Sequence, residues 1–430
     1  MPDASENRPP AFDPRPSVRA AVAGALAGLV GGAYRLVLGA NAPWSSERIA
    51  RLAHRPVDWV GVTVLFAAGA ALSRWLTVRF APEAAGSGIP QVEESIAGSR
   101  SLRWHRLLPV KFVGGVLALA SGLSLGREGP TVHLGAGIAS ALEGPLGASA
   151  RRAMLAAGAA AGLTAAFSAP IASFIFVLEE LRLRPSRLVV STVLPAVLAS
   201  YLVVQRLVGP GPMFAVPLQP TPSAALTPLF LALGVAAGMV GVVFNRGLLG
   251  SLDLFAALPR RPAWLGAAAV GALAAVVAYW LPGAIGGGEH AVDAMIQGRM
   301  PLALAGLIVF LVVKLGLTLA SYGCGVPGGI FAPQLVLGAA TGAIVHALAQ
   351  GVGGGTLGPV LATAGMVGVF AASVRAPMTG LMLLVELTHS GRFLIPQATA
   401  ALAAYLFAAA IRDTPVYEAL RERDDQHGRG

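Results

Sequence analysis

The sequence predicts an all-α membrane protein built from two related halves. Of its 430 residues, 55% are hydrophobic and only 12% are charged, whereas about 25% of the residues of a soluble domain are charged. So few charged side chains would leave large apolar patches bare on a soluble protein of this length. The apolar stretches also lack the alternation of a membrane β-barrel. Membrane-spanning helices are therefore favoured, and roughly ten to fourteen would fit.

Apolar segments follow one another along both halves of the chain. They lie at about residues 17–40, 56–80, 106–125, 131–142, 153–181 and 188–208, and then at about 224–250, 262–282, 301–322, 329–349, 356–388 and 393–411. Several are too short, or too broken by glycine and proline, to cross a bilayer as one straight helix. In a membrane such breaks persist only where they are buried in protein or line a polar cavity.

The predicted domain organisation follows from these segments. A proline-rich linker, residues 209–223, separates a first membrane repeat (17–208) from a second (224–412). Residues 1–16 are polar and are expected to form a disordered cytoplasmic tail, and residues 413–430 a second cytoplasmic tail that carries Tyr417. Within this second tail we expect disorder from Asp424 onward.

The second half of the chain repeats landmarks of the first. Lys111 recurs as Lys314, Pro170 as Pro377 and Glu179 as Glu386, and the offset between matching residues grows from 200 to 207 along the chain. Transporter folds are often built from such internal repeats, whose interrupted helices meet at the substrate site. The alternative is chance similarity in a sequence rich in alanine, glycine and leucine.

Charge and composition narrow the function. The formal net charge is +10, but both lysines lie inside apolar segments and the arginines gather at segment ends, as in the cytoplasmic loops of membrane proteins. We therefore expect no nucleic-acid partner. The single cysteine, Cys324, excludes a disulfide within the chain. No spacing is typical of a metal site or a nucleotide-binding loop, so we expect no cofactor, no metal and no enzyme activity.

Three glycine-rich turns, each followed at once by an apolar segment, are the candidate site. Glycine lets the backbone approach a ligand closely, and proline near a helix start costs no hydrogen bond. Each turn thus predicts a helix N-terminus with free N–H groups and a partial positive charge, and three together would bind an anion weakly enough to release it. The alternative is three ordinary helix breaks. The turns are Gly86-Ser87-Gly88-Ile89-Pro90, Gly126-Arg127-Glu128-Gly129-Pro130 and Gly329-Ile330-Phe331-Ala332-Pro333.

In their order and spacing, these turns resemble the signature motifs of the CLC chloride channels and proton-coupled chloride antiporters. The resemblance extends from about Pro82 to Tyr417 and includes the stretches LPVKF, GAAAGLTAAFSAPI and SVRAPMTG. It implies an inverted-topology repeat with many tilted, interrupted helices, a homodimer, and one anion pathway in each subunit. It also implies a multi-pass protein of a prokaryotic inner membrane, whose partners are chloride and related small anions, protons and the lipid bilayer.

The resemblance also implies which groups hold the anion. Ser87 and Tyr417 would donate their hydroxyls, which add directed donors without adding charge. The backbone N–H groups of Ile330 and Phe331 would lie beside them. For Tyr417 the alternative is an aromatic anchor at the membrane interface. The remaining predicted anion-binding residues are glycines of the first two turns: Gly86, Gly88 and Gly129.

Glu128 is the predicted gate and external proton acceptor. A carboxylate at a helix start among anion-binding amides can occupy the anion's place, and it must leave that place when it is protonated. Glu128 aligns with Phe331 in the second half, which has the same turn without the acid. The alternative is a carboxylate that only caps its helix. Arg127 is expected to contribute its N–H and to attract anions at the mouth of the pathway, or instead to pair with a carboxylate.

Glu180 is the predicted internal proton-transfer group. The resemblance implies this role, because antiporters of the family carry a glutamate here and channels generally replace it. An acid within a membrane segment is costly and by default functional, although a structural glutamate paired with arginine is the alternative. Glu179 is expected to be structural. With both acids, the sequence predicts a proton-coupled chloride antiporter; a passive chloride channel is the alternative, and an intramembrane enzyme with Glu128 as base is a remote one.

Overall fold

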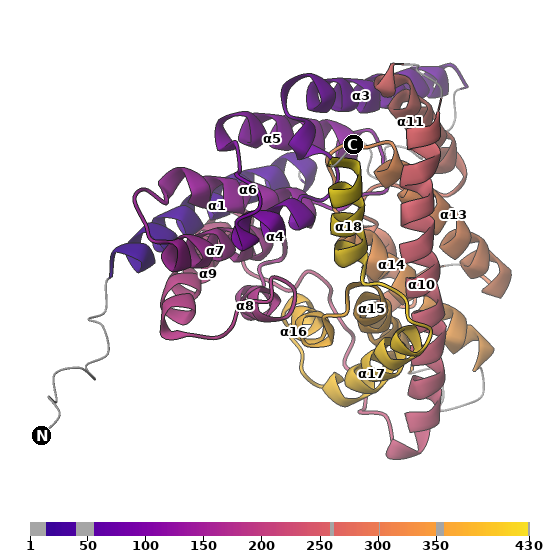
Figure 1. The fold of residues 1–430 in the computed structure, drawn as a ribbon. Helices are drawn as coiled ribbons and strands as arrows, with labels where there is room; N and C mark the ends of the chain where they lie inside the picture. The colour runs from indigo at the N-terminus through magenta and orange to yellow at the C-terminus, as the bar shows by residue number, and fades with distance from the viewer. Residues whose placement is uncertain (1–13, 40–55, 259–261, 301, 350–356, 429–430) are drawn as a thin grey trace, which may run out of the picture.

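The computed structural model describes residues 14–39, 56–258, 262–300, 302–349 and 357–428, and these residues form an α-helical bundle (Figure 1). The first-half helices are α1 (Arg15–Gly39), α3 (Pro56–Phe80), α4 (Ile89–Ala97), α5 (Trp104–Ala120), α6 (Glu128–Leu142), α7 (Ala148–Phe167), α8 (Pro170–Glu179) and α9 (Arg187–Val208). The second-half helices are α10 (Thr227–Ala257), α11 (Ala263–Trp280), α12 (Glu289–Ile296), α13 (Leu304–Gly323), α14 (Phe331–Leu348), α15 (Gly358–Val374), α16 (Pro377–Thr388), α17 (Leu394–Ala410) and α18 (Val416–Gly428). This confirms the predicted fold class.

Many of these helices are shorter than a bilayer is thick, as expected for segments interrupted by glycine and proline. Among the described residues, 7 helices are long and apolar enough to cross a membrane. The apolar segment 153–181 is two helices, α7 and α8, which are separated at Ser168 and Ala169. Segment 356–388 is likewise divided, into α15 and α16, immediately before Pro377. Hydrophobicity continues across both breaks, so hydropathy alone does not reveal them.

The two breaks are held by a reciprocal pair of glutamates. The carboxylate of Glu386, near the end of α16, accepts hydrogen bonds from the N–H groups of Ile171 (2.9 Å) and Ala172 (2.7 Å) at the start of α8. Glu179, at the end of α8, does the same for Met378 (3.1 Å) and Thr379 (2.6 Å) at the start of α16. Each acid caps the other half's helix, so α8 and α16 lie antiparallel, side by side where the two halves meet (Figure 1). Such reciprocity is the mark of an inverted repeat, and it gives Glu179 the structural role expected for it.

The two buried lysines show the same symmetry. Lys111 Nζ donates to the carbonyl oxygens of Ala84 (3.0 Å) and Gly86 (2.8 Å), which lie just before α4. Lys314 Nζ donates to those of Ala284 (3.0 Å) and Gly286 (2.7 Å), just before α12. An ammonium group that satisfies two buried carbonyls helps to fix the turn that carries them. Both lysines therefore shape the turns that lead into short helices.

Glycines set the spacing of the central helices. At the crossing of α6 and α7, a Cβ added to Gly158 would meet the carbonyl oxygen of Gly135; at the crossing of α14 and α15, a Cβ on Gly365 would meet that of Gly338. Close backbone approach through small residues is how membrane helices pack without a hydrophobic driving force. Helices α6 and α14 begin at two of the glycine-rich turns. The crossings therefore fix where these turns lie relative to α7 and α15.

The described ends of the chain differ from the expected tails. Helix α1 begins at Arg15, inside the segment expected to be disordered, and residues 1–13 lie outside the described residues. The expectation of disorder from Asp424 was wrong as far as Gly428, because these residues continue α18. That helix is anchored to the bundle: Gln91 Nε2 donates to Asp424 (3.1 Å), and Arg423 pairs with Asp253 (2.9 Å).

We expect Gly158→Ala and Gly365→Ala each to lower the free energy of unfolding by about 1–3 kcal/mol, because the added methyl group forces two backbones apart. The measurement is thermal unfolding of the purified protein in detergent. Gly316→Ala in α13 is the matched control, since a Cβ there has no neighbour within 4 Å, and it should be neutral or stabilising. Equal stability of all three variants would contradict the proposed role of the crossings.

Candidate anion and proton site

The three glycine-rich turns lie together and are joined by backbone hydrogen bonds. The N–H of Gly126 donates to the carbonyl of Gly329 (2.8 Å), and that of Gly329 donates back (2.7 Å). The N–H of Gly328 donates to the carbonyl of Gly86 (3.0 Å), and that of Gly86 to Val326 (3.1 Å). The third turn thus lies between the other two, and the N-termini of α4, α6 and α14 converge on one buried region.

Gly129 is the tightest point of this junction. A Cβ at Gly129 would lie 2.9 Å from the Cα atoms of both Gly329 and Ser87. No residue other than glycine fits between the turns without moving them. Gly86 and Gly88 are required for a different reason, because their φ angles of 62° and 91° lie in the left-handed region that favours glycine.

Glu128 points its carboxylate at the start of α14. Its side chain is fully buried, and Oε1 accepts hydrogen bonds from the backbone N–H groups of Phe331 (2.7 Å) and Ala332 (3.3 Å). These are free N–H groups of a helix N-terminus, where an anion is stabilised by the helix dipole. The other oxygen, Oε2, has no hydrogen-bond partner. The carboxylate therefore binds where two first-turn amides of α14 are available for an anion.

Two hydroxyl groups complete this region. Ser87 is buried, and its Oγ accepts from the N–H of Ile89 (3.2 Å), which leaves its own proton available to donate. Tyr417, in the first turn of α18, is buried with its hydroxyl unpartnered. The Tyr417 ring packs against Phe331, with ring centroids 5.8 Å apart. A buried hydroxyl without a partner beside an anion-binding turn is a donor available for a ligand, whereas an interfacial anchor would be exposed.

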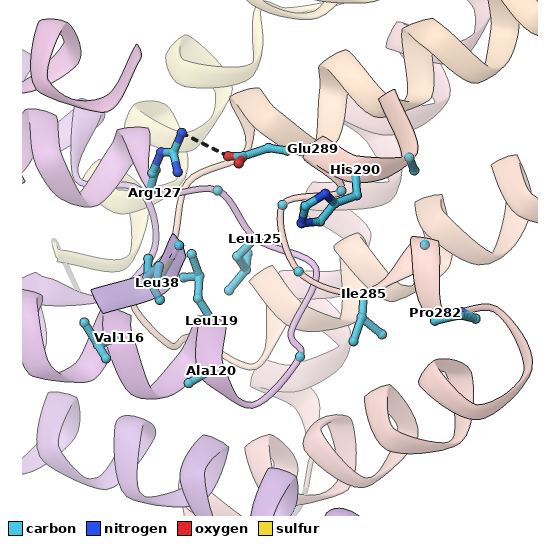
Figure 2. A pocket seen from close by; sticks show the side chains of 18 of the residues that line it. Leu38, Val116, Leu119, Ala120, Leu125, Arg127, Pro282, Ile285, Glu289 and His290 are labelled. Atoms are coloured by element: carbon cyan, nitrogen blue, oxygen red, sulfur yellow. Dashed lines mark ion pairs between the residues drawn. The ribbon is translucent and has the colours of Figure 1, made fainter. Parts of the chain in front are cut away.

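Arg127 lies on the wall of a cavity of about 400 Å³ beside the Gly126 turn. Its Nε donates to the carbonyl of Ala166 (3.2 Å), and its Nη2 pairs with the carboxylate of Glu289 at 3.2 Å. Figure 2 shows these two side chains pointing toward one another across the cavity. Of the two expectations for Arg127, pairing with a carboxylate is what the structure shows.

Glu180 lies in a cluster of acids and arginines near α18. The carboxyl groups of Glu180 and Glu93 lie within electrostatic range of each other. Arg421 pairs with Glu93 (3.4 Å), and Arg182 pairs with Glu418 (2.6 Å). Two neighbouring carboxyl groups disfavour ionisation of both at once. The pair is therefore suited to hold a proton.

Three contacts at the site were not predicted from the sequence. Ala332 supplies a second amide to Glu128 beside that of Phe331, whereas the sequence predicted the amides of Ile330 and Phe331 as donors to the anion. The hydroxyl of Tyr322, on α13, accepts from the N–H of Ser87 (3.4 Å). Glu289 pairs with Arg127. A usable signal existed for Ala332 alone, because it follows Phe331 in the same helix start; Tyr322 and Glu289 reach the site only through tertiary packing.

Comparisons with known proteins find matches over most of the chain. A family model described as voltage gated chloride channel matches residues 68–409. The H(+)/Cl(-) exchange transporter ClcA of Vibrio vulnificus strain YJ016 is 35% identical over 420 residues, covering 94% of this chain and 88% of that protein. ClcA of Vibrio cholerae strain O395 is 36% identical over 419 residues, covering 93% and 87%. The crystal structure of a slow cyanobacterial Cl⁻/H⁺ antiporter superimposes with a TM-score of 0.90 at 31% identity, over 96% of this chain and 99% of that one.

We expect Gly129→Ala to weaken chloride binding by at least about tenfold, because the methyl group must separate turns whose amides act together. Isothermal titration of chloride into chloride-free protein measures this. Gly316→Ala serves as the control and should bind as the unmodified protein does. If Gly129→Ala elutes as a folded protein and keeps its affinity, the turns do not form the anion site.

Proposed function

This chain belongs to the family of voltage-gated chloride channels, and we propose that it exchanges chloride for protons across the inner membrane, with Glu128 as the group that couples the two ions. The two ClcA relatives are named as exchangers and match nearly the whole chain. The helices of this chain are those of a multi-pass membrane protein. The observation that carries the role of Glu128 is its carboxylate on the amides of Phe331 and Ala332.

Glu128 and chloride compete for the same donors. An ionised Glu128 satisfies the first-turn amides of α14, which are the groups that an anion would use. Protonation removes the charge that holds the side chain there, so its hydrogen bonds weaken. A chloride ion can then take its place among the amides. Because the acid leaves only when protonated and returns only when it loses the proton, proton and chloride occupancy are linked at one position.

The anion is held by dipoles and hydroxyls without a full positive charge. The buried ammonium groups of Lys111 and Lys314 are engaged with carbonyl oxygens. The available donors are first-turn amides and the hydroxyls of Ser87 and Tyr417. Partial charges of this kind bind a desolvated halide and still release it. The site therefore suits a transported ion better than a permanently bound one.

Protons reach the site from the α18 side through Glu180 in this proposal. Glu180 lies within electrostatic range of Glu93, and two neighbouring acids disfavour ionisation of both at once, so a proton can be stored there. Tyr417 lies within electrostatic range of both Glu128 and Glu180. The two acids therefore share one tyrosine as a neighbour. This role for Glu180 is preferred to that of a structural glutamate paired with arginine, because the arginines of the cluster pair with Glu93 and Glu418. The homodimer implied by the family resemblance also belongs to this proposal, and the mass of the detergent-solubilised particle tests it.

We expect purified protein in liposomes to pump protons uphill when a chloride gradient is imposed. Glu128→Gln and Glu128→Ala should reduce proton flux by about 100-fold or more, because the proton acceptor is lost, while chloride flux continues. The measurements are external pH and chloride-electrode recordings on the same liposomes. Glu143→Gln is the control, since Glu143 pairs with Arg151 at 3.1 Å on the surface. Chloride flux without uphill proton movement in the unmodified protein would favour a passive channel.

Glu180→Gln should also abolish proton movement and leave chloride flux, because a glutamine cannot carry a proton between Glu93 and the site. Its neighbour gives a matched comparison. Glu179→Gln removes charge from the cap of α16 and should lower thermal stability while coupling is retained in the folded fraction. If Glu180→Gln still pumps protons at the normal rate, the internal route does not use this acid.

A further inference from the structure

The ion pair between Arg127 and Glu289 lies in the wall of the cavity beside the site. Figure 2 shows the two side chains pointing toward one another, with the apolar side chains of Leu38, Leu125 and Ile285 below them in the view. The Arg127 side chain is only 9% exposed, whereas that of Glu289 is 38% exposed. The arginine is thus fixed in the wall, and the carboxylate is the partner with access to solvent.

The arginine pattern predicts that this cavity faces the side of the membrane opposite the cytoplasm. Helices α1, α5 and α11 all end at residues that line the cavity or directly precede its lining. The same helices begin beside arginines: α1 at Arg15, α5 after Arg103, and α11 after Arg261 in the sequence. Arginines gather at the cytoplasmic ends of membrane helices. The cavity is therefore the predicted outer mouth of the pathway.

The charges at this mouth are not balanced. Arg35, on α1, lies within electrostatic range of both Arg127 and Glu289, and it donates to Ser168 Oγ (2.7 Å). Two guanidinium groups thus lie within electrostatic range of the Glu289 carboxylate. The Nε of Arg127 donates a hydrogen bond to the carbonyl of Ala166. Its Nη2 is therefore the nitrogen that faces the cavity, and it pairs with the carboxylate of Glu289.

The ion pair lies close to the gate. Arg127 directly precedes Glu128 in the chain. A Cβ at Gly287 would lie 3.8 Å from both Glu289 Oε1 and the Cβ of Ala332, whose N–H binds Glu128. An anion that arrives at Arg127 is therefore next to the amides it must reach, and the carboxylate of Glu289 is the last negative charge it meets before Glu128.

We propose that Glu289 is a tethered counterion for Arg127, which small anions must displace at the outer mouth, so that it limits how tightly this mouth holds them. The proposal rests on the exchange function proposed above and adds a residue that sets the affinity of the outer mouth for anions. An unpaired guanidinium in a poorly solvated wall binds anions strongly, and an ion held too tightly at the mouth does not move on. A carboxylate that competes for the same guanidinium nitrogen weakens that binding. The guanidinium groups of Arg127 and Arg35 still attract the anion.

The test compares chloride dependence at the two faces of the membrane. Right-side-out and inside-out vesicles from expressing cells expose the outer and inner mouths respectively, and chloride uptake is measured over a range of chloride concentrations. Glu289→Gln should lower the half-saturating chloride concentration at the outer face by about two- to fivefold, the range expected for partly solvated charges, with no change at the inner face. Glu289→Asp should restore the normal value.

A second ion pair of the same helix is the matched control. Asp293, one turn further along α12, pairs with Arg299 at 2.8 Å and does not line the cavity. Asp293→Asn should leave both half-saturating concentrations unchanged. In an Arg127→Gln background, Glu289→Gln should have a smaller effect, because its partner is gone.

Two outcomes would overturn the proposal. One is a folded Glu289→Gln protein with an unchanged outer half-saturating concentration, which would leave Glu289 a purely structural partner of Arg127. The other is an equal shift at both faces. Neither is confused with failure of the exchange function, because uphill proton pumping by the unmodified protein in the same vesicles reports that separately.

Discussion

A free helix N-terminus buried among helices is the constraint on which the structure depends. Amides that are cut off from water must find an acceptor, and the start of α14 finds one in Glu128. Everything around it serves to bring that start, and those of α4 and α6, to one point: glycine turns bonded to each other, lysines that hold the turns, and glycine crossings that let the central helices approach closely. In the proposed function, helix ends left without permanent partners form the anion site.

The two repeats form a symmetric scaffold. One sequence difference between them makes the two halves unlike at the site. Glu128 and Phe331 occupy matching positions at the starts of α6 and α14. In one half the side chain is an acid that reaches across to the other half's amides. In the other half it is an aromatic ring that packs against Phe176, Phe370 and Tyr417. In the proposed function, proton dependence thus enters through one half, and the aromatic wall beside the anion comes from the other.

The sequence was a good guide to features that local residues decide. Glycine and proline at a helix start act within a few residues, so the three turns and the acid at the start of the second could be predicted, and the repeat paired Lys111 with Lys314. Features decided by packing were missed. Tyr322 contacts Ser87, which is 235 residues away in the sequence. The two helix breaks before Pro170 and Pro377 also depend on packing, because the backbone N–H groups that follow them are satisfied by Glu386 and Glu179 from the opposite half. Only the folded arrangement identifies Glu289 as the partner of Arg127.

The exchanged glutamate caps have a consequence for how such a chain arises. Glu179 completes a helix of the second half, and Glu386 completes one of the first. Half of the molecule on its own would leave the amides at the start of its short helix bare in lipid, so it would be stable only beside a second copy facing the other way. The fused chain is in this sense a dimer that has become covalent, and its two partners have since been free to diverge into an acid-bearing and an aromatic member.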